Sequence, residues 1–296
     1  ECGVNIVECG IAFEDSERLS HNEEVTHFIA NTLCNVARKQ DSTLQARPVR
    51  SFDDLAEAYK LVYKEYLARK YCSPNPRGMH YTAFCFLPET RTFILEKKGS
   101  LLGTLTLIPD TLCGLPSEAV FPGEIKKLRQ PGRYLAEVSL LALDLAQFMA
   151  RRFALADLMK LSQALCLFKV MINYSDYAGI TDLVISVHPK HEKLYRYFEF
   201  KSVSEIRSYA AANNNPALAM HLDYESFKKN ASSNKRLKAY MLEKTTPVEL
   251  FKNYYRWNPD LIRQWSQPIQ PLQPAVCHYL NQCYPDLNLP ATDTGF

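Results

Sequence analysis

The sequence lacks several features that would assign it to a broad class of protein. No apolar run approaches the roughly 20 residues of a transmembrane helix, so we expect no membrane span. The first residues have no basic segment and no long apolar core, which argues against a secretory signal. An excess of one charge is also lacking, because 35 basic residues face 32 acidic ones. A nucleic-acid binder usually concentrates more positive charge, so that class is not favoured.

The cysteines follow no metal or disulfide motif. The nine cysteines are scattered, no Cys-x-x-Cys occurs, and none has a pair of histidines at zinc-finger spacing. We therefore expect reduced thiols and a cytoplasmic protein. His188 and His191 are three residues apart, but no third ligand is near in the sequence, so we expect no metal.

The composition is that of an ordinary folded protein, and local patterns predict a mixed fold. Of the 296 residues, 47% are hydrophobic and 23% are charged. We expect helices and strands in alternation, with antiparallel pairs and one crossover, which defines an α+β or mixed α/β class. The predicted helices cover 21–39, a segment starting at Ser51, about 123–129, 146–175, 189–198 and 247–265. The predicted strands cover 91–96, 101–108, 133–143, 181–187, 200–206 and 217–222, and the first two are expected to form a hairpin through a turn at Lys97–Ser100.

Three segments are expected along the chain. Residues 1–48 are predicted to form an N-terminal helical arm, and 49–225 the main domain. Residues 226–296 are predicted to be an extension packed on that domain, with a polar linker first and six prolines between 259 and 290. We expect 268–290 to run along the surface in extended form.

One carboxylate stands out in the chain. Glu137 lies in the middle of the apolar run 134–143, where an unpaired charge would be costly to bury. It could act as a general base, or it could satisfy a backbone donor. Ser139 shares its face of the predicted strand by the two-residue period. No Gly-x-Ser-x-Gly elbow surrounds Ser139, so a positioning hydrogen bond is favoured over a nucleophilic role.

Five segments in order carry a resemblance to a known family. The segments are Ala56–Tyr66, Leu102–Leu107, Ala136–Leu141, His188–Phe200 and Asn215–Leu222. Over about residues 50–225 the chain resembles the Gcn5-related N-acetyltransferase superfamily. It looks closest to the branch of long-chain N-acyl amino acid synthases, with the acyl-homoserine lactone synthases as cousins. The resemblance implies a central mixed sheet flanked by helices.

The resemblance also implies roles for individual residues. Glu137, Ser139 and Tyr195 would form the catalytic group, with Tyr195 protonating the leaving thiolate. Acyl or acceptor contacts would come from Tyr63, Thr104, Thr106, Val138, Leu140 and His191. For the threonines, an ordinary strand role is the simpler reading, and Tyr195 is equally consistent with a helix residue facing water. Where many synthase relatives have Arg after the Ser, this chain has Leu140.

The donor is predicted from a missing motif. Acetyl-CoA enzymes of the superfamily carry a glycine-rich loop whose backbone N–H groups hold the pyrophosphate. Residues 144–154 contain no glycine. We therefore expect an acyl donor on the phosphopantetheine of acyl carrier protein, with acyl-CoA less favoured and no bound cofactor. Basic residues are expected either to dock this acidic partner or to form a solvated face: Lys126, Lys127, Arg129, Arg151 and Arg152.

These observations predict an acyltransferase. A long-chain acyl group would pass from acyl carrier protein directly to the α-amine of an amino acid, without an acyl-enzyme. Two alternatives remain at this point: a non-catalytic protein of the same fold that binds an acyl chain or a partner, and an enzyme like the acyl-homoserine lactone synthases.

Overall fold

The computed structural model describes residues 9–10, 35, 44–144, 146, 153–229, 235–269 and 272–290. A mixed sheet forms its centre, with strands in the order β2-β3-β4-β5-β6-β9-β7. The strands are β1 Cys9–Gly10, β2 Gln45–Pro48, β3 Arg91–Lys97, β4 Ser100–Pro109, β5 Leu135–Leu143, β6 Asp182–Val187, β7 Lys201–Ser202, β8 Arg207–Tyr209 and β9 Asn215–Asp223. β1 pairs with β5, and β8 pairs with β9.

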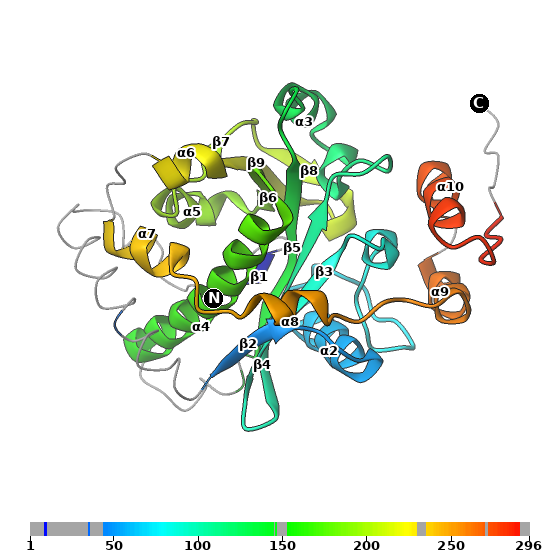
Figure 1. Cartoon of the computed structure of the whole chain (residues 1–296), viewed down its shortest axis with the longest axis horizontal. Helices are drawn as coiled ribbons and strands as arrows, with labels where there is room; N and C mark the ends of the chain where they lie inside the picture. The colour runs from blue at the N-terminus through cyan, green and yellow to red at the C-terminus, as the bar shows by residue number, and fades with distance from the viewer. Residues whose placement is uncertain are drawn as a thin grey trace.

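Helices surround this sheet. The α-helices are α2 Phe52–Ala68, α3 Pro122–Leu128, α4 Phe153–Ala178, α5 Glu192–Tyr197, α6 Tyr224–Lys229, α7 Lys235–Leu242, α8 Val248–Lys252, α9 Pro259–Ser266 and α10 Pro274–Cys283. The 3-10 helices are η2 Ala83–Phe86, η3 Pro116–Ala119, η5 Pro189–His191, η6 Ala210–Ala212 and η7 Gln267–Ile269. Figure 1 shows α2 and α4 on opposite faces of the sheet. The predicted class, a mixed sheet flanked by helices, is confirmed.

Local sequence signals explain where the main elements begin and end. The Ser51 hydroxyl accepts the N–H of Asp54 at 3.1 Å and caps α2. Lys98 and Gly99 both have positive φ and form the two-residue turn of the predicted hairpin between β3 and β4. Gly179, at φ +73°, ends α4 because a residue without Cβ adopts this left-handed conformation at little cost.

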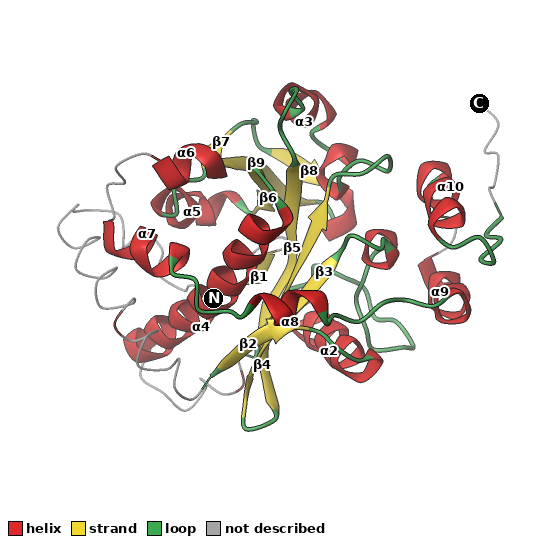
Figure 2. Ribbon diagram, viewed as in Figure 1, coloured by secondary structure: helices red, strands yellow, loops and turns green. Residues whose placement is uncertain are grey.

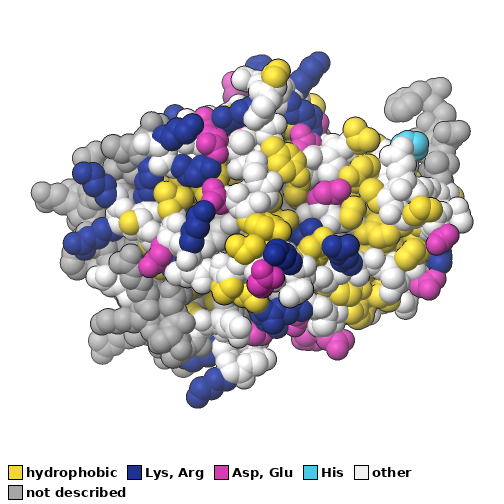
Figure 3. Space-filling view, viewed as in Figure 1, with side chains coloured by type: hydrophobic (Ala, Val, Ile, Leu, Met, Phe, Trp, Pro, Cys, Tyr) yellow, Lys and Arg dark blue, Asp and Glu magenta, His cyan; other side chains and the backbone are white. Residues whose placement is uncertain are grey.

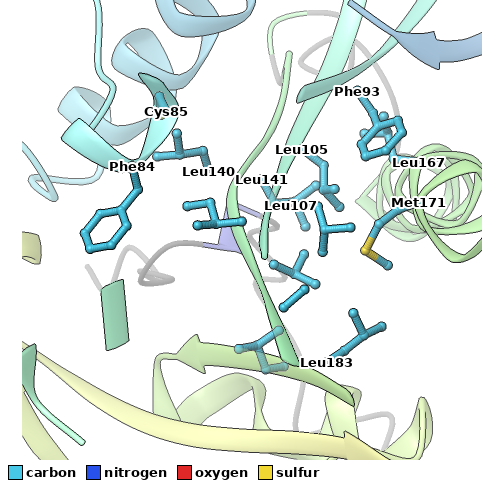
Figure 4. Packing of buried hydrophobic residues seen from close by; sticks show 14 of the residues in the cluster. Phe84, Cys85, Phe93, Leu105, Leu107, Leu140, Leu141, Leu167, Met171 and Leu183 are labelled. Carbon is cyan, nitrogen blue, oxygen red and sulfur yellow. The ribbon is translucent and has the colours of Figure 1, made fainter. Parts of the chain in front are cut away.

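The core lies on both faces of the sheet. On one face Leu105 and Leu107 of β4 pack near Leu167 and Met171 of α4, and on the other Leu140 lies on the side of Phe84 and Cys85 (Figure 4). The strands β3, β4 and β5 are buried almost throughout. Such near-continuous apolar strands are expected where helices cover both faces.

The C-terminal extension wraps around the edge of the sheet that β2 forms. α7 packs against α4, and the Tyr174 ring of α4 lies 5.4 Å from that of Phe251 in α8. The chain then crosses β2, where the N–H of Tyr255 donates to the carbonyl of Val49 at 2.9 Å. α9 follows and packs on α2, where the Trp265 ring lies 4.9 Å from that of Phe52, and α10 contacts η2. Figure 2 shows α9 and α10 on the side of the molecule beyond α2. The extension therefore contacts both helical layers.

Several sequence predictions are wrong in detail. The strand expected over 200–206 is reduced to the two residues of β7. The segment after residue 226, expected to be a linker, contains α6 and α7. The extended chain expected over 268–290 contains the helix α10. Pro274 occupies the first turn of α10, where a missing N–H costs nothing, so proline composition was a poor guide there.

The N-terminal segment differs from the prediction where it is described. Gln45–Pro48, placed in a helical arm by the sequence, is the edge strand β2, paired with β3. The helix predicted over 21–39 lies outside the described residues, apart from Asn35, and so does most of the first turn predicted for the long helix, at 147–152. In the part of the chain that is described, no helix has the length and hydropathy needed to cross a membrane.

Candidate active site

The central feature of the site is a buried carboxylate on β5. Glu137 has no exposed surface, and its Oε2 accepts the backbone N–H of Ser117 at 2.9 Å. Ser117 belongs to η3, which the chain forms between β4 and α3. An N–H donor stabilises the ionised form of a carboxyl group, so this bond offsets part of the cost of burying Glu137.

The sheet divides beside Glu137. Leu135 to Glu137 pair with Asp182 to Val184 of β6 in parallel. Further along β5, Leu141 and Ala142 pair instead with Cys9 and Gly10 of β1. Glu137 is therefore the last β5 residue paired with β6. The carboxyl ends of neighbouring parallel strands are a common place for ligands to bind where a sheet divides.

A β-bulge follows immediately. Thr106 of β4 pairs with Ser139 and Thr104 pairs with Ala142. An advance of three residues along β5 therefore corresponds to an advance of two residues along β4. Leu140 lies within this bulge with φ +52°, a conformation that is rare for a residue with a branched side chain. Backbone strain of this kind is concentrated at functional sites. No pattern in the sequence predicted the bulge.

Polar side chains continue from Glu137 across one face of the sheet. Glu137 and Ser139 share a face by the two-residue period. Ser139 is opposite Thr106, whose hydroxyl lies 3.0 Å from that of Thr92 on β3. All three of these hydroxyl-bearing residues are buried. The row therefore joins β5 to β3 through the sheet interior.

Other predicted binding residues are placed differently from this row. The Thr104 hydroxyl donates to the carbonyl of Phe93 at 3.0 Å, which is a role within the sheet. Val138 lies between Glu137 and Ser139 on β5, so its side chain points to the opposite face. Tyr63 lies on α2, and its hydroxyl accepts the N–H of Asn75 at 3.1 Å, which holds the loop after that helix.

His191 and Tyr195 follow the end of β6, at the edge where β5 and β6 separate. Both side chains are completely buried. The Tyr195 ring packs 5.9 Å from Phe200 and 6.3 Å from Phe198. His188 caps η5, because its Nδ1 accepts the N–H of Lys190 at 3.2 Å. This histidine therefore has a structural role.

The predicted docking residues are not equivalent. Lys126 and Lys127 are exposed on α3, and neither forms an ion pair with the residues described. Arg129 instead bonds to Asp110 at 2.6 Å and to Glu118 at 2.8 Å. Burial raises the pKa of Glu118, but hydrogen bonds from Arg129 and from the N–H of Leu115 outweigh it and lower the pKa below its ordinary value. Arg151 and Arg152 lie outside the described residues.

The fold is similar to that of a known N-acyl amino acid synthase. The divided mixed sheet with a helix on each face is similar to one solved structure. The structure of FeeM, an N-acyl amino acid synthase from uncultured soil microbes, is 27% identical over 62% of this chain and 93% of that chain, with a TM-score of 0.52.

The family follows from the sequence. A family model described as N-acyl amino acid synthase FeeM matches residues 57–223, more than half of the chain. The chain belongs to the FeeM family of N-acyl amino acid synthases, and the predicted resemblance is confirmed. It is therefore an N-acyltransferase. A comparison with curated protein sequences finds no match.

Two acyl-homoserine lactone synthases are also similar in structure. LasI is 16% identical, with a TM-score of 0.47, over 66% of this chain and 93% of that chain. BjaI, described as CoA-dependent, is 12% identical, with a TM-score of 0.49, over 80% of this chain and 98% of that chain.

Proposed function

We propose that the protein transfers a long-chain acyl group from acyl carrier protein to the α-amine of an amino acid. The observation that carries the proposal is the position of Glu137: a buried carboxylate, oriented by the Ser117 N–H, at the point where β5 leaves β6. The fatty acyl thioester would enter where the strands separate. The amine would approach from the face that carries Glu137 and Ser139.

In the proposed reaction the amine nitrogen attacks the thioester carbonyl directly. Glu137 accepts the proton that the amine loses, either directly or through one water molecule. The carbon–nitrogen bond forms and the carbon–sulfur bond breaks, so the products are an amide and the phosphopantetheine thiol. Tyr195 supplies the proton to the leaving thiolate, and Ser139 positions the reacting groups by a hydrogen bond. His191 and Leu140 would line the acyl or acceptor site.

The proposed donor rests on the sequence after β5. The absence of glycine from 144–154 leaves no backbone cradle of the usual kind for a CoA pyrophosphate. A carrier protein presents only the phosphopantetheine arm and has an acidic surface that exposed lysines can attract. Lys126 and Lys127 are the proposed docking residues. Arg129 is a weaker candidate, since two carboxylates already compensate its charge. Use of acyl carrier protein implies action in the cytoplasm.

The function is tested by product analysis. Purified protein is incubated with palmitoyl carrier protein and a pool of the twenty amino acids, and the lipid extract is analysed by mass spectrometry. We expect one or a few N-acyl amino acids that are absent when the carrier protein or the enzyme is omitted. Formation of a lactone from S-adenosylmethionine would instead favour a homoserine lactone synthase. Binding of the acyl carrier without any turnover would favour the non-catalytic alternative.

A further inference from the structure

A partly open pocket lies away from Glu137, between the family domain and the C-terminal extension. Its volume is about 220 Å³. One wall is formed by α2 and the start of β3, including Tyr59, Thr90 and Thr92. The opposite wall consists of residues 254–257 and 283–284. The family match ends at residue 223, so this second wall is a feature of the present chain outside the family domain.

Hydrogen bonds fix the second wall against the first. The Trp257 Nε1–H donates to the backbone carbonyl of Cys85 at 2.8 Å. The Tyr284 hydroxyl donates to the backbone carbonyl of Phe86 at 3.4 Å. The Trp257 ring is 4.9 Å from that of Phe86 in an edge-to-face arrangement. Figure 3 shows hydrophobic side chains gathered over α9, α10 and the neighbouring η2. The cavity is thus bounded by packed, rigid groups.

Two tyrosine hydroxyls in the lining are buried without a hydrogen bond. They belong to Tyr59, which is 1% exposed, and to Tyr255. Burial raises the pKa of both phenols, and the nearby Cys85 thiol adds to the effect on Tyr59. Cys85 and Thr92 lie near the Tyr59 hydroxyl, but the Thr92 hydroxyl bonds to that of Thr106 at 3.0 Å. Buried polar groups are nearly always paired, so a partner inside the cavity would explain both hydroxyls.

The size and charge of the lining define the ligand class. A cavity of about 150 Å³ accommodates benzene, so this one suits a single ring with a short substituent and is too small for a long acyl chain. Aromatic faces line it, from Tyr59, Tyr254 and Trp257 among others. Arg256 is the one charged residue among the described lining residues. It is exposed, its guanidinium lies 5.1 Å from the centre of the Tyr254 ring, and it forms no ion pair with the described residues.

We propose that this cavity binds a small hydroxylated aromatic acid, with its ring between the aromatic walls and its carboxylate at Arg256. The ring hydroxyl would meet Tyr59 at the deep end. An amino acid fits less well, because the described lining residues include no carboxylate to pair with its ammonium group. The cavity is also separate in position from the proposed acceptor site beside Ser139. Thr92 and Ser139 are separated by two strand spacings, about 10 Å across the sheet.

The cavity also has a physical connection to the proposed catalytic face. Thr92 belongs to the cavity lining and bonds to Thr106, which is opposite Ser139. A bound acid would also hold residues 254–257 against β3. Ligand binding to the folded state alone raises the apparent stability of the protein.

Binding is tested on the full-length protein by isothermal titration and by tryptophan fluorescence, with 4-hydroxyphenylacetate as the probe. Phenylacetate lacks the ring hydroxyl, 4-hydroxyphenylacetamide lacks the charge, and acetate lacks the ring. We expect saturable binding of 4-hydroxyphenylacetate, weaker binding of phenylacetate and of the amide, and none of acetate. Tyrosine should bind more weakly than 4-hydroxyphenylacetate.

Matched variants assign the contacts. Arg256→Gln should weaken 4-hydroxyphenylacetate about tenfold or more, since a charge-assisted hydrogen bond is lost. Tyr59→Phe keeps the ring and should remove the advantage of 4-hydroxyphenylacetate over phenylacetate. Arg236→Gln, an exposed change on α7, is the control and should have no effect. The proposal is overturned if no aromatic acid binds saturably, if Arg236→Gln acts like Arg256→Gln, or if tyrosine binds as tightly as the acid. None of these results depends on acyl transfer.

Discussion

The Ser117 N–H and the Glu137 carboxylate are joined by a 2.9 Å hydrogen bond, although the two residues are 20 positions apart in the chain. The bond fixes the orientation of Glu137 from outside its own strand. It brings η3 against the sheet at the place where β5 leaves β6. Because the donor is a backbone N–H, a substitution of the Ser117 side chain would leave this hydrogen bond in place.

The first prediction concerns the Glu137 carboxylate. Glu137→Gln keeps the shape of the side chain but removes the base, so kcat should fall by about 10²–10⁴-fold. The far-ultraviolet circular dichroism spectrum should be unchanged. Glu96→Gln is a matched control. Glu96 lies on β3 beside the hairpin turn, away from the proposed site on β5, and forms an ion pair with Arg47. A Glu137→Gln enzyme within threefold of wild type, with the same pH profile, would reduce Glu137 to a structural residue.

The second prediction concerns the donor. Acyl carrier protein should give a much higher kcat/KM than the same acyl group on CoA, and added salt should reduce this value. The double variant Lys126→Glu and Lys127→Glu should raise KM for the carrier while leaving kcat nearly unchanged. The double variant Lys97→Glu and Lys98→Glu at the hairpin tip is the control, since these lysines are also adjacent and exposed. Equal kcat/KM for the two donors would refute the carrier assignment.

The third prediction concerns the C-terminal extension. Trp257 is 8% exposed and bonds to Cys85, so Trp257→Ala should lower the free energy of unfolding by about 3–5 kcal/mol. Leu112→Ala, at a side chain that is 80% exposed, should change it little. Urea unfolding followed by circular dichroism measures both.

A truncation gives an independent check of the extension. Ending the chain after Lys229 would expose the face of α4 that α7 covers and the aromatic groups beside α2. We expect an aggregating or much less stable protein. A soluble monomer with the wild-type melting temperature would mean that the extension contributes nothing to this fold.

The fourth prediction concerns Asp182, which is buried between β5 and β9. Burial raises its pKa, but hydrogen bonds from His221, Arg133 and Thr181 outweigh this and lower the pKa to about 2. A lowered pKa in the folded state stabilises the protein above the unfolded pKa of about 3.9, and the stabilisation is lost as the pH falls toward 2. Asp182→Asn should therefore cost about 2 kcal/mol at pH 7, and its difference from wild type should shrink below pH 4.

Unfolding free energies measured from pH 7 to pH 3 test this dependence. Asp260→Asn serves as the control, since the Asp260 side chain is 90% exposed. A constant difference between Asp182→Asn and wild type over that range would show that the charge of Asp182 does not stabilise the fold.

Sequence patterns predicted the elements whose signal is local. The Ser51 cap, the Lys98–Gly99 turn and the apolar run around Glu137 each depend on neighbouring residues, and each is found in the structure. The bulge at Leu140 was not predictable, because it arises from the register between β4 and β5. The hydrogen bond from the Ser117 N–H to Glu137 was also not predictable, since no spacing rule relates residues 117 and 137. Proline content misled the prediction for α10, where packing of Val276 and Leu280 favours a helix.

The most direct test of the central claim is the intact mass of the carrier protein during the reaction. Palmitoyl carrier protein is incubated with wild-type enzyme, with or without the amino acid identified in the product. We predict that the carrier loses the mass of its acyl group only when both enzyme and amino acid are present, that the enzyme mass stays unchanged, and that Glu137→Gln nearly abolishes the loss. An acyl group that stays on the carrier under all conditions, or that appears on the enzyme, would contradict direct transfer to an amine.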